Sequence, residues 1–301
     1  MNQSKKLLGI SCGALSTQYG DIRALEICAE AGFDSVDFDL LTNPYTNDPS
    51  EKTDEEMIEY CQSLKKRANE LGIIIGQTHG LCSTFNPNDD EYNAYVIEAS
   101  RRHLLATASL GAPACVIHSI STHNWQDATP ETMRRVNLEM FGKLIPFAEE
   151  YGVNIALETF GDVRKGGRRI DFFGNVEELK NQYELLNTKN KVLCMDTGHT
   201  HKAHDIEPSV LDTVDAIRYL GKDIKLLHLN DNNGYSDQHL PPFLAGDSLQ
   251  LKWKNVMSAL DEIEYDGIYN FELTMGKMGS AIEDYTHFLG KYLRRFIDGT
   301  L

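Results

Sequence analysis

A short unit of apolar and polar positions recurs along the chain. Each copy begins with the end of an amphipathic helix and continues with a glycine, a short apolar or β-branched run and a polar residue. The glycines Gly32, Gly72, Gly111 and Gly152 are spaced by roughly 40 residues, the length of one strand–helix unit. Glycine just past a helix adopts the left-handed cap conformation without steric cost, and an apolar run that follows a helix is typical of a buried parallel strand.

The repeat predicts eight strands, near residues 7–12, 35–39, 73–78, 114–118, 154–158, 192–196, 224–229 and 267–272. Amphipathic segments between them, for example 55–71 and 132–151, are predicted as helices. Eight alternating strands and helices define an α/β fold, a single (β/α)8 TIM barrel. No interdomain linker interrupts the pattern, so we expect one domain over residues 1–301. A doubly wound open sheet is the alternative, but no GxGxxG loop follows the first strand.

Composition narrows the class of protein. The 301 residues are 41% hydrophobic and 25% charged, with a net charge of −16. A chain this acidic repels nucleic-acid phosphates and anionic membranes unless one face is locally basic, so we expect neither as a partner. No run approaches the roughly 20 apolar residues of a membrane span, and the first apolar stretch is too short for a signal peptide.

The six cysteines are scattered and form no CxxC pair. This spacing predicts neither a zinc finger nor a disulfide framework. Several of the cysteines lie in apolar runs, where a cysteine usually behaves as a small buried hydrophobe. A reducing compartment fits this usage, so we expect a cytoplasmic protein.

The ends of six predicted strands carry residues of metal-ligand type: His79, His118, Glu158, Asp196, His228 and Glu272. Active sites of such barrels lie at the carboxyl ends of the strands. A lone histidine there is more often structural, but several carboxylates buried together are costly unless a cation neutralises them. We therefore predict one divalent metal, Mn²⁺, Mg²⁺, Co²⁺ or Zn²⁺, held by Glu158, Asp196, His228 and Glu272.

Five motifs occur in order along the later strands: ALE at 156–158, MDTGH at 195–199, HLND at 228–231, DQHLPP at 237–242 and FEL at 271–273. Together they resemble the xylose isomerase-like TIM barrel superfamily, which contains sugar and sugar-phosphate isomerases and epimerases and the related endonuclease IV. In the isomerases and epimerases, the positions that match the four predicted ligands bind one divalent metal. The resemblance also implies that His199 faces a substrate.

Isomerisation and epimerisation of sugars both begin with removal of a proton next to a carbonyl. A metal stabilises the enediolate that forms, and a carboxylate takes the proton. Our hypothesis is that Glu158 and Glu272 are the catalytic pair, as the matching glutamates are in related ketose 3-epimerases. His199 would hold a substrate hydroxyl, and we expect His79, His118, Asp237 and His239 to face the substrate as well.

Two positions depart from the ketose 3-epimerases. Those enzymes have a glutamate six residues beyond the strand-five ligand and an arginine six beyond the strand-seven histidine; here these are Arg164 and Gly234. Arg164 opens a basic run, RKGGRR, that could hold a substrate phosphate or carboxylate or could be a solvated loop or a subunit contact. Trp125 could form one wall of the sugar pocket or pack in a lid.

Three alternatives remain open beside a metal-dependent sugar or sugar-phosphate isomerase or epimerase. An inosose dehydratase-type lyase shares the first proton abstraction. In a trinuclear-zinc abasic-site endonuclease resembling endonuclease IV, His79 and His118 would help to hold one further zinc, and His199, Asp237 and His239 another; the charge of −16 argues against it. The third is a non-catalytic sugar-binding relative. We expect a small-molecule sugar partner, and a homo-oligomer is left open.

Overall fold

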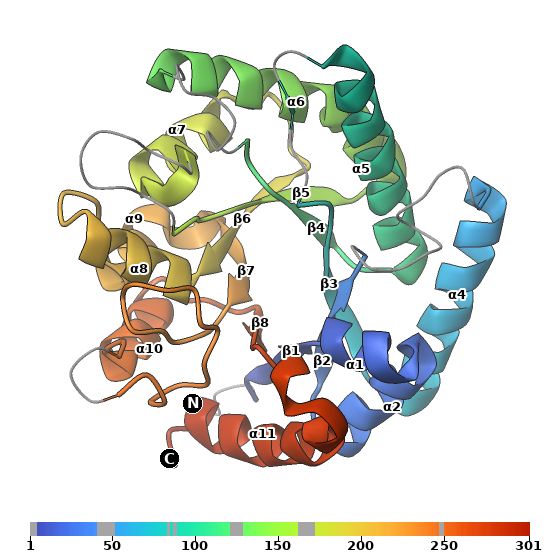
Figure 1. Cartoon of the computed structure of the whole chain (residues 1–301), viewed down its shortest axis with the longest axis vertical. Coiled ribbons are helices and arrows are strands. Elements are labelled where there is room, and N and C mark those ends of the chain that lie inside the picture. Colours follow the sequence, from blue (N-terminus) through green and yellow to red (C-terminus); the bar gives the residue numbers. More distant parts are fainter. Residues whose placement is uncertain are drawn as a thin grey trace.

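Eight parallel strands form the centre of the molecule, in a computed structural model that describes residues 5–40, 52–82, 85–86, 89–120, 129–161, 172–246 and 250–301 (Figure 1). The strands are β1 (Leu7–Ser11), β2 (Ser35–Asp39), β3 (Ile74–His79), β4 (Ala114–Ile117), β5 (Asn154–Glu158), β6 (Lys191–Asp196), β7 (Ile224–His228) and β8 (Ile268–Phe271). Their bounds confirm the predicted strands to within one residue at either end.

The strands lie in the order β7-β6-β5-β4-β3-β2-β1-β8. Neighbours pair in parallel throughout. The ring is joined between β7 and β8 just beyond the end of β7, where the Leu229 amide donates to Asn270 O at 2.8 Å and the Glu272 amide donates to Leu229 O at 3.2 Å. The result is the nearly closed (β/α)8 barrel that the sequence predicts.

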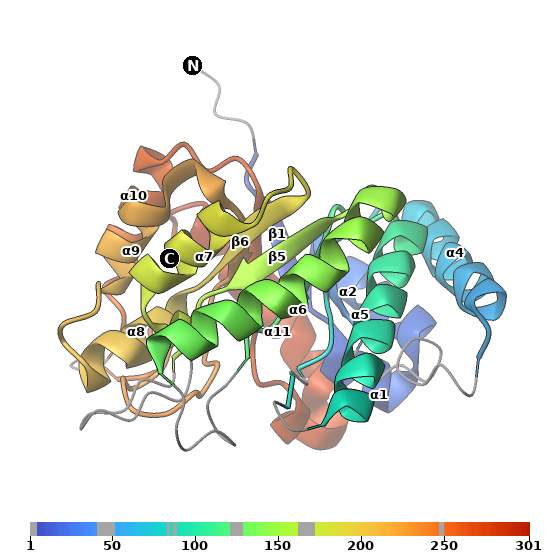
Figure 2. The ribbon, with the colours of Figure 1, turned by 90° about the horizontal axis from the view of Figure 1, so that it is seen from above.

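Helices surround the strands on all sides of the barrel (Figure 1). The α-helices are α1 (Gly13–Tyr19), α2 (Asp21–Glu30), α4 (Asp54–Leu71), α5 (Asp90–Leu110), α6 (Pro130–Tyr151), α7 (Val176–Leu185), α8 (Thr197–Ile206), α9 (Thr213–Leu220), α10 (Trp253–Glu262) and α11 (Ile282–Ile297). Short 3-10 turns are η1 (Phe172–Gly174), η2 (Gly221–Asp223) and η3 (Gly276–Ala281). Figure 2 shows α4, α5 and α6 lying side by side along one flank.

The ends of these helices follow the local sequence. Thr53 caps α4 through a capping box with Glu56, and Thr129 caps α6, whose first residue is a proline. Gly72 ends α4 at φ 70° and ψ 22°, and Gly152 ends α6 at φ 69° and ψ 30°. Both glycines adopt the left-handed cap conformation that the repeat predicts.

The alternation of side chains along the strands explains where the site lies. One large apolar cluster packs the helices against the strands, while a small cluster contains strand side chains only: Ala114, Val116, Ala156, Cys194 and Leu226. Because strand side chains alternate between two faces, the next position on the same face after Val116, Ala156, Cys194 and Leu226 is His118, Glu158, Asp196 and His228. The site residues are therefore the last inward-facing layer of the barrel.

Within the described ranges, no helix combines the length and the apolar character that crossing a membrane requires.

Candidate active site

The four residues predicted as metal ligands meet at the mouth of the barrel. Ligand atoms of Glu158, Asp196, His228 and Glu272 all lie within 4.8 Å of one another. Glu158, Asp196 and His228 are the last residues of β5, β6 and β7, and Glu272 directly follows β8. His228 Nδ1 lies 2.7 Å from Glu158 Oε1 and 3.2 Å from Glu272 Oε2. The structure thus brings the predicted set together from four neighbouring strands.

The carboxylate of Asp196 is fixed by the elements on either side of it. The residue is fully buried and caps α8, where its Oδ1 accepts the His199 amide at 2.7 Å. Its Oδ2 accepts the Asn230 side-chain amide at 2.9 Å. Since Asp196 both ends a strand and begins a helix, its orientation is set by backbone geometry.

His228 is held from its far side by two polar residues inside the barrel. Its Nε2 lies 2.8 Å from Gln77 Nε2 and 3.4 Å from Asp37 Oδ2. Asp37 also accepts from Ser11 Oγ at 3.1 Å. A histidine whose second nitrogen faces such partners is fixed in ring orientation, which leaves Nδ1 directed at the two glutamates.

The buried charges shift one another's pKa values. Burial raises the pKa of Asp196 to about 6, and the nearby Glu272 and Glu158 add to this. Burial alone would raise the pKa of Glu158 too, but His228 and His118 hold it well below its usual value. Burial opposes a charge on His228, yet the neighbouring acidic groups raise its pKa well above the usual range. The site therefore attracts positive charge.

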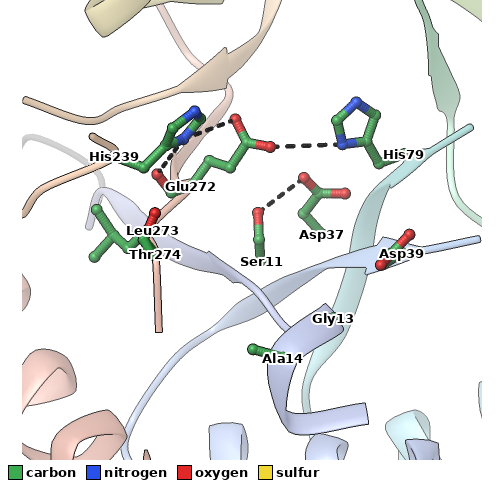
Figure 3. A pocket seen from close by; sticks show the side chains of 10 residues that line it. All are labelled: Ser11, Gly13, Ala14, Asp37, Asp39, His79, His239, Glu272, Leu273 and Thr274. Carbon is green, nitrogen blue, oxygen red and sulfur yellow. Dashed lines mark hydrogen bonds and ion pairs between the residues drawn. The ribbon is translucent and has the colours of Figure 1, made fainter. Parts of the chain in front are cut away.

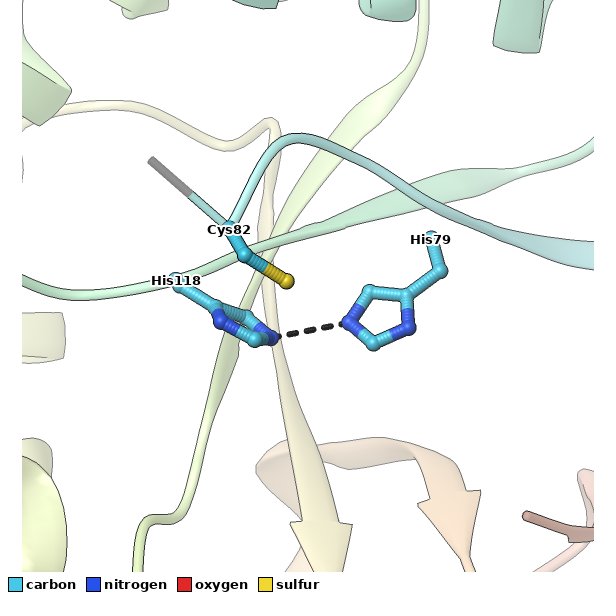
Figure 4. Close-up of side chains that lie close together, drawn as sticks. All are labelled: His79, Cys82 and His118. Carbon is cyan, nitrogen blue, oxygen red and sulfur yellow. Dashed lines mark hydrogen bonds between the residues drawn. The ribbon is translucent and has the colours of Figure 1, made fainter. Parts of the chain in front are cut away.

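A second group contains His79, Cys82 and His118, with ligand atoms also within 4.8 Å of one another. The Nε2 atoms of the two histidines are 2.8 Å apart, and in Figure 4 the Cys82 sulfur points toward the space between the rings. Burial opposes protonation of His118, but Cys82 and Glu158 raise its pKa to about 10. His118 Nε2 is 3.1 Å from Glu158 Oε2, so this group adjoins the first.

A third group contains His199, Asp237 and His239. Asp237 Oδ2 lies 3.2 Å from His199 Nε2, and its Oδ1 lies 3.3 Å from His239 Nε2. Burial opposes ionisation of Asp237, but the two histidines lower its pKa. His239 has a left-handed backbone at φ 48°, an uncommon conformation outside glycine that turns its ring back over Glu272, with Nδ1 3.1 Å from the Glu272 carbonyl.

A cavity of about 300 Å³ opens beside these groups and is drawn in Figure 3. Glu272 reaches across it between His79 and His239, at 3.5 Å from each ring. Asp37, Asp39 and Ser11 line another side. A cavity of this size is large enough for a small polar molecule, and Glu272 is the member of the proposed catalytic pair that lines it.

Sequence reasoning missed two residues of the site. Phe160 follows β5, and its ring stacks on His199 at 5.6 Å between centroids and meets His118 edge-on at 4.9 Å. The sequence indicates that several of the six cysteines are buried; five are, and Cys82 is exposed. Its position three residues after the strand-end residue His79 is the one signal that could have separated it from the rest.

Two predicted substrate contacts, Arg164 and Trp125, lie outside the described residues. The other departure, Gly234, has a structural reason. It adopts φ +77°, and a Cβ there would come within 1.8 Å of Asp205 Oδ2. An arginine here would be strained by the positive φ and would require the Asp205 side chain to move.

The chain belongs to the xylose isomerase-like TIM barrel family, whose model matches residues 25–289. This confirms the family resemblance of the sequence motifs. An uncharacterised protein of Methanocaldococcus jannaschii, MJ1311, is 27% identical over 218 residues, which are 71% of this chain and 68% of that protein.

Two solved structures share the fold. The IolI protein with a bound zinc atom superposes with a TM-score of 0.73 at 18% identity, covering 98% of this chain and 99% of that one. D-psicose 3-epimerase in the presence of D-fructose superposes with a TM-score of 0.69 at 18% identity, covering 97% and 99%. At such identities the likeness concerns the fold.

Proposed function

We propose that the protein is a divalent-metal-dependent isomerase or epimerase of a sugar or sugar phosphate. The observation that supports this most strongly is the convergence of Glu158, Asp196, His228 and Glu272 on one point at the mouth of the barrel. Its relatives of the same fold include an epimerase studied with a ketose and a protein that binds zinc, which agrees with this assignment.

The residues fit a divalent cation. Two carboxylates, Glu158 and Asp196, are almost completely buried, and Glu272 adds a third that is only 18% exposed. Glu158 Oε2 accepts no well-aligned hydrogen bond within the described part of the chain. Burying this much negative charge is costly without a cation, and three carboxylates with one imidazole suit Mn²⁺, Co²⁺, Mg²⁺ or Zn²⁺.

When bound, the ion would supply Lewis-acid polarisation of the substrate carbonyl. Proton transfer falls to the chain itself. Glu158 is kept ionised by His228 and His118, so its carboxylate is ready to accept a proton near neutral pH. Glu272 approaches His228 Nδ1 alongside Glu158, from the strand that closes the barrel, and we assign it the return of the proton.

The remaining polar groups at the mouth would orient the substrate. His199 donates from Nδ1 to the Thr159 carbonyl at 2.8 Å, which leaves Nε2 toward Asp237 and the opening. Phe160, stacked on His199, offers an apolar face of the kind that packs on sugar C–H groups. These contacts favour a small polyhydroxylated substrate.

The test is exchange of a substrate proton with solvent deuterium, followed by NMR on a panel of ketoses, aldoses and their phosphates. With Mn²⁺ or Co²⁺ added, the wild type should exchange at least one member of the panel and form its isomer or epimer. Glu158→Gln and Glu272→Gln should each lower the rate by about 10²–10⁴-fold. Glu150→Gln, an exposed acid on α6, should not change the rate.

If either active-site glutamine variant kept most of the activity, the catalytic assignment would be wrong. Loss of water from an inosose would indicate the lyase. A nuclease with further zincs is supported by the third group of potential ligands. Cleavage of an abasic duplex would establish it, against the acidic charge of the chain.

A further inference from the structure

The outer side of α11 carries a row of exposed residues, which we call the α11 stripe: Asp284, Phe288, Lys291 and Arg295. Their spacing of four, three and four places them along one line on a helix. The opposite side of α11 is buried, with Leu289 among the residues that pack inward. Figure 1 shows α11 at the edge of the molecule, so the α11 stripe faces outward.

Phe288 lies at the centre of a stack of aromatic rings. Its side chain is 51% exposed, and its ring stacks on Tyr285 and on Tyr292, with centroids 6.1 Å and 5.5 Å apart. The Tyr292 hydroxyl donates to the Pro242 carbonyl at 2.7 Å, next to the exposed Phe243. An aromatic surface that is already held in place loses little conformational freedom on binding, and such surfaces are typical of the centres of protein interfaces.

We infer that the α11 stripe binds a second copy of this chain, in which two α11 helices pack antiparallel about a twofold axis. Residues spaced by four, three and four form the contact line of paired helices, as in a coiled coil. A twofold interface brings the same surface of both copies together, so the surface must be complementary to itself. This goes beyond the proposed function, because it concerns a surface and a partner outside the barrel mouth.

The order of the side chains along α11 favours this partner. A twofold axis between Phe288 and Lys291 places each Phe288 opposite the partner's Lys291. The same axis places each Asp284 opposite the partner's Arg295, because the two residues lie equally far from the axis in sequence. Each contact then occurs twice, once from either copy.

Both contacts join groups that attract each other. A lysine ammonium over the face of an aromatic ring forms a cation–π contact, which suits Lys291 and Phe288. Asp284 and Arg295 would form a carboxylate–guanidinium pair. Arg295 already donates one bond to the Thr300 carbonyl at 3.1 Å, and a guanidinium has five N–H donors, so others remain for a partner.

The local charge also suits a meeting of two copies. The chain has a net charge of −16, so two molecules repel each other at long range. The α11 stripe differs from this average, because it has two basic residues and one acid. We expect the aromatic centre to supply most of the affinity and the charges at both ends to fix the antiparallel register.

The first experiment measures dimerisation of the full chain by sedimentation equilibrium in EDTA. The wild type should be a dimer, and Phe288→Glu should weaken dimerisation by about 30-fold or more. Leu185→Glu is the matched control, because Leu185 is a 54% exposed apolar residue on α7, away from α11 in Figure 1. It should dimerise as the wild type does. Both variants should keep the circular dichroism spectrum of the wild type, since both side chains are exposed.

The second experiment reverses the charges at the two ends of the α11 stripe. Asp284→Arg and Arg295→Asp each place like charges opposite each other, so each variant alone should be largely monomeric. When the two variants are mixed, every end contact joins opposite charges again, and a mixed dimer should form. The double variant Asp284→Arg/Arg295→Asp should also dimerise with itself.

Three outcomes would overturn the inference. A wild type that stays monomeric from micromolar to millimolar concentration would leave the α11 stripe to a different partner. A dimer that survives in Phe288→Glu, or that is lost equally in Leu185→Glu, would place the interface elsewhere. Failure of the two charge variants to pair on mixing would rule out the antiparallel arrangement. No readout needs a substrate or a metal, so these outcomes are independent of the proposed function.

Discussion

The two oxygens of Glu158 face two different histidines from neighbouring parts of the site. Oε1 is 2.7 Å from His228, while Oε2 is directed at His118. A carboxylate in this position can hold an ion, take a proton, or do both in turn. The surrounding histidines keep it ionised even though it is buried, so its reactivity is set by its neighbours rather than by exposure.

His103 makes a pH-dependent contribution that can be measured apart from the site. This histidine of α5 is fully buried, and neither ring nitrogen has a hydrogen-bond partner among the residues described. Burial, with Arg102 and His79 nearby, lowers its pKa to about 3, against about 6.5 in an unfolded chain. As the pH falls below about 6.5, His103 takes up a proton in the unfolded chain but not in the folded chain. The free energy of unfolding therefore falls.

Between pH 7 and pH 5 this histidine should cost the folded state about 2 kcal/mol. His103→Gln removes the titration and should flatten the pH dependence by that amount, whatever it does to stability at pH 7. Urea unfolding of both proteins in EDTA at pH 5, 6 and 7 measures the difference. Equal pH slopes would mean that His103 is protonated, or solvated, in the folded protein.

Single site residues could be predicted from the sequence where they end a strand, but not where they lie in a loop. Glu158, Asp196 and His228 are the polar residues that end apolar runs, so the strand–helix repeat located them at the carboxyl ends of strands from sequence alone. Phe160 lies two residues beyond the end of β5, and Cys82 lies three beyond the end of β3. No periodicity describes the path of a loop, and the contacts of Cys82 with His118 and of Phe160 with His199 depend on that path.

At the level of elements, the segment between β7 and α10 carries two members of the third group of potential ligands, Asp237 and His239. Asp231 is fully buried near its start. It accepts hydrogen bonds from the backbone amides of Asn232, Phe243 and Leu251 and from the indole Nε1 of Trp253. Leu240 pairs with Asp231 through two backbone bonds. One carboxylate therefore ties both ends of the segment that presents Asp237 and His239.

Asp231→Asn should loosen that segment. The side-chain NH₂ of asparagine would face hydrogen-bond donors at a position where aspartate has an acceptor oxygen. We therefore expect a loss of about 2–4 kcal/mol in the free energy of unfolding. Hydrogen exchange should rise in residues 236–246 more than in β7 itself. Asp212→Asn is the matched control, because asparagine caps a helix as well as aspartate and Asp212 caps α9. Similar effects of both substitutions would contradict this role.

For the whole molecule, the proposed metal joins four strands that close the barrel. Its ligands come from the ends of β5, β6 and β7 and from the residue after β8, next to the place where only a few backbone bonds connect β7 to β8. The barrel itself followed from the repeat of strands and helices in the sequence. The sequence predicts strands that include Leu229 and Glu272, but not that β7 and β8 meet through these two residues just beyond the regular strands.

An ion that binds only the folded barrel must stabilise all of it. At a free metal concentration of about 100 times the dissociation constant, the gain is about 2.7 kcal/mol, which for a chain of this length raises the melting temperature by roughly 5 °C. Scanning calorimetry in EDTA and in Mn²⁺ should show this rise in the wild type. Glu272→Gln should lose most of it, since the variant removes one of the four ligands.

Glu283→Gln provides the comparison. Glu283 belongs to a surface group with Glu30 and His287 whose atoms are also close enough to hold an ion, but it pairs with Arg23 at 2.7 Å and is partly solvated. Exposed acids that are already paired gain little from a cation, so this variant should keep the full rise. If Glu283→Gln lost the rise in melting temperature and Glu272→Gln kept it, the metal would bind at the surface group and not at the barrel mouth. The proposed metal-dependent chemistry at the mouth would then be wrong.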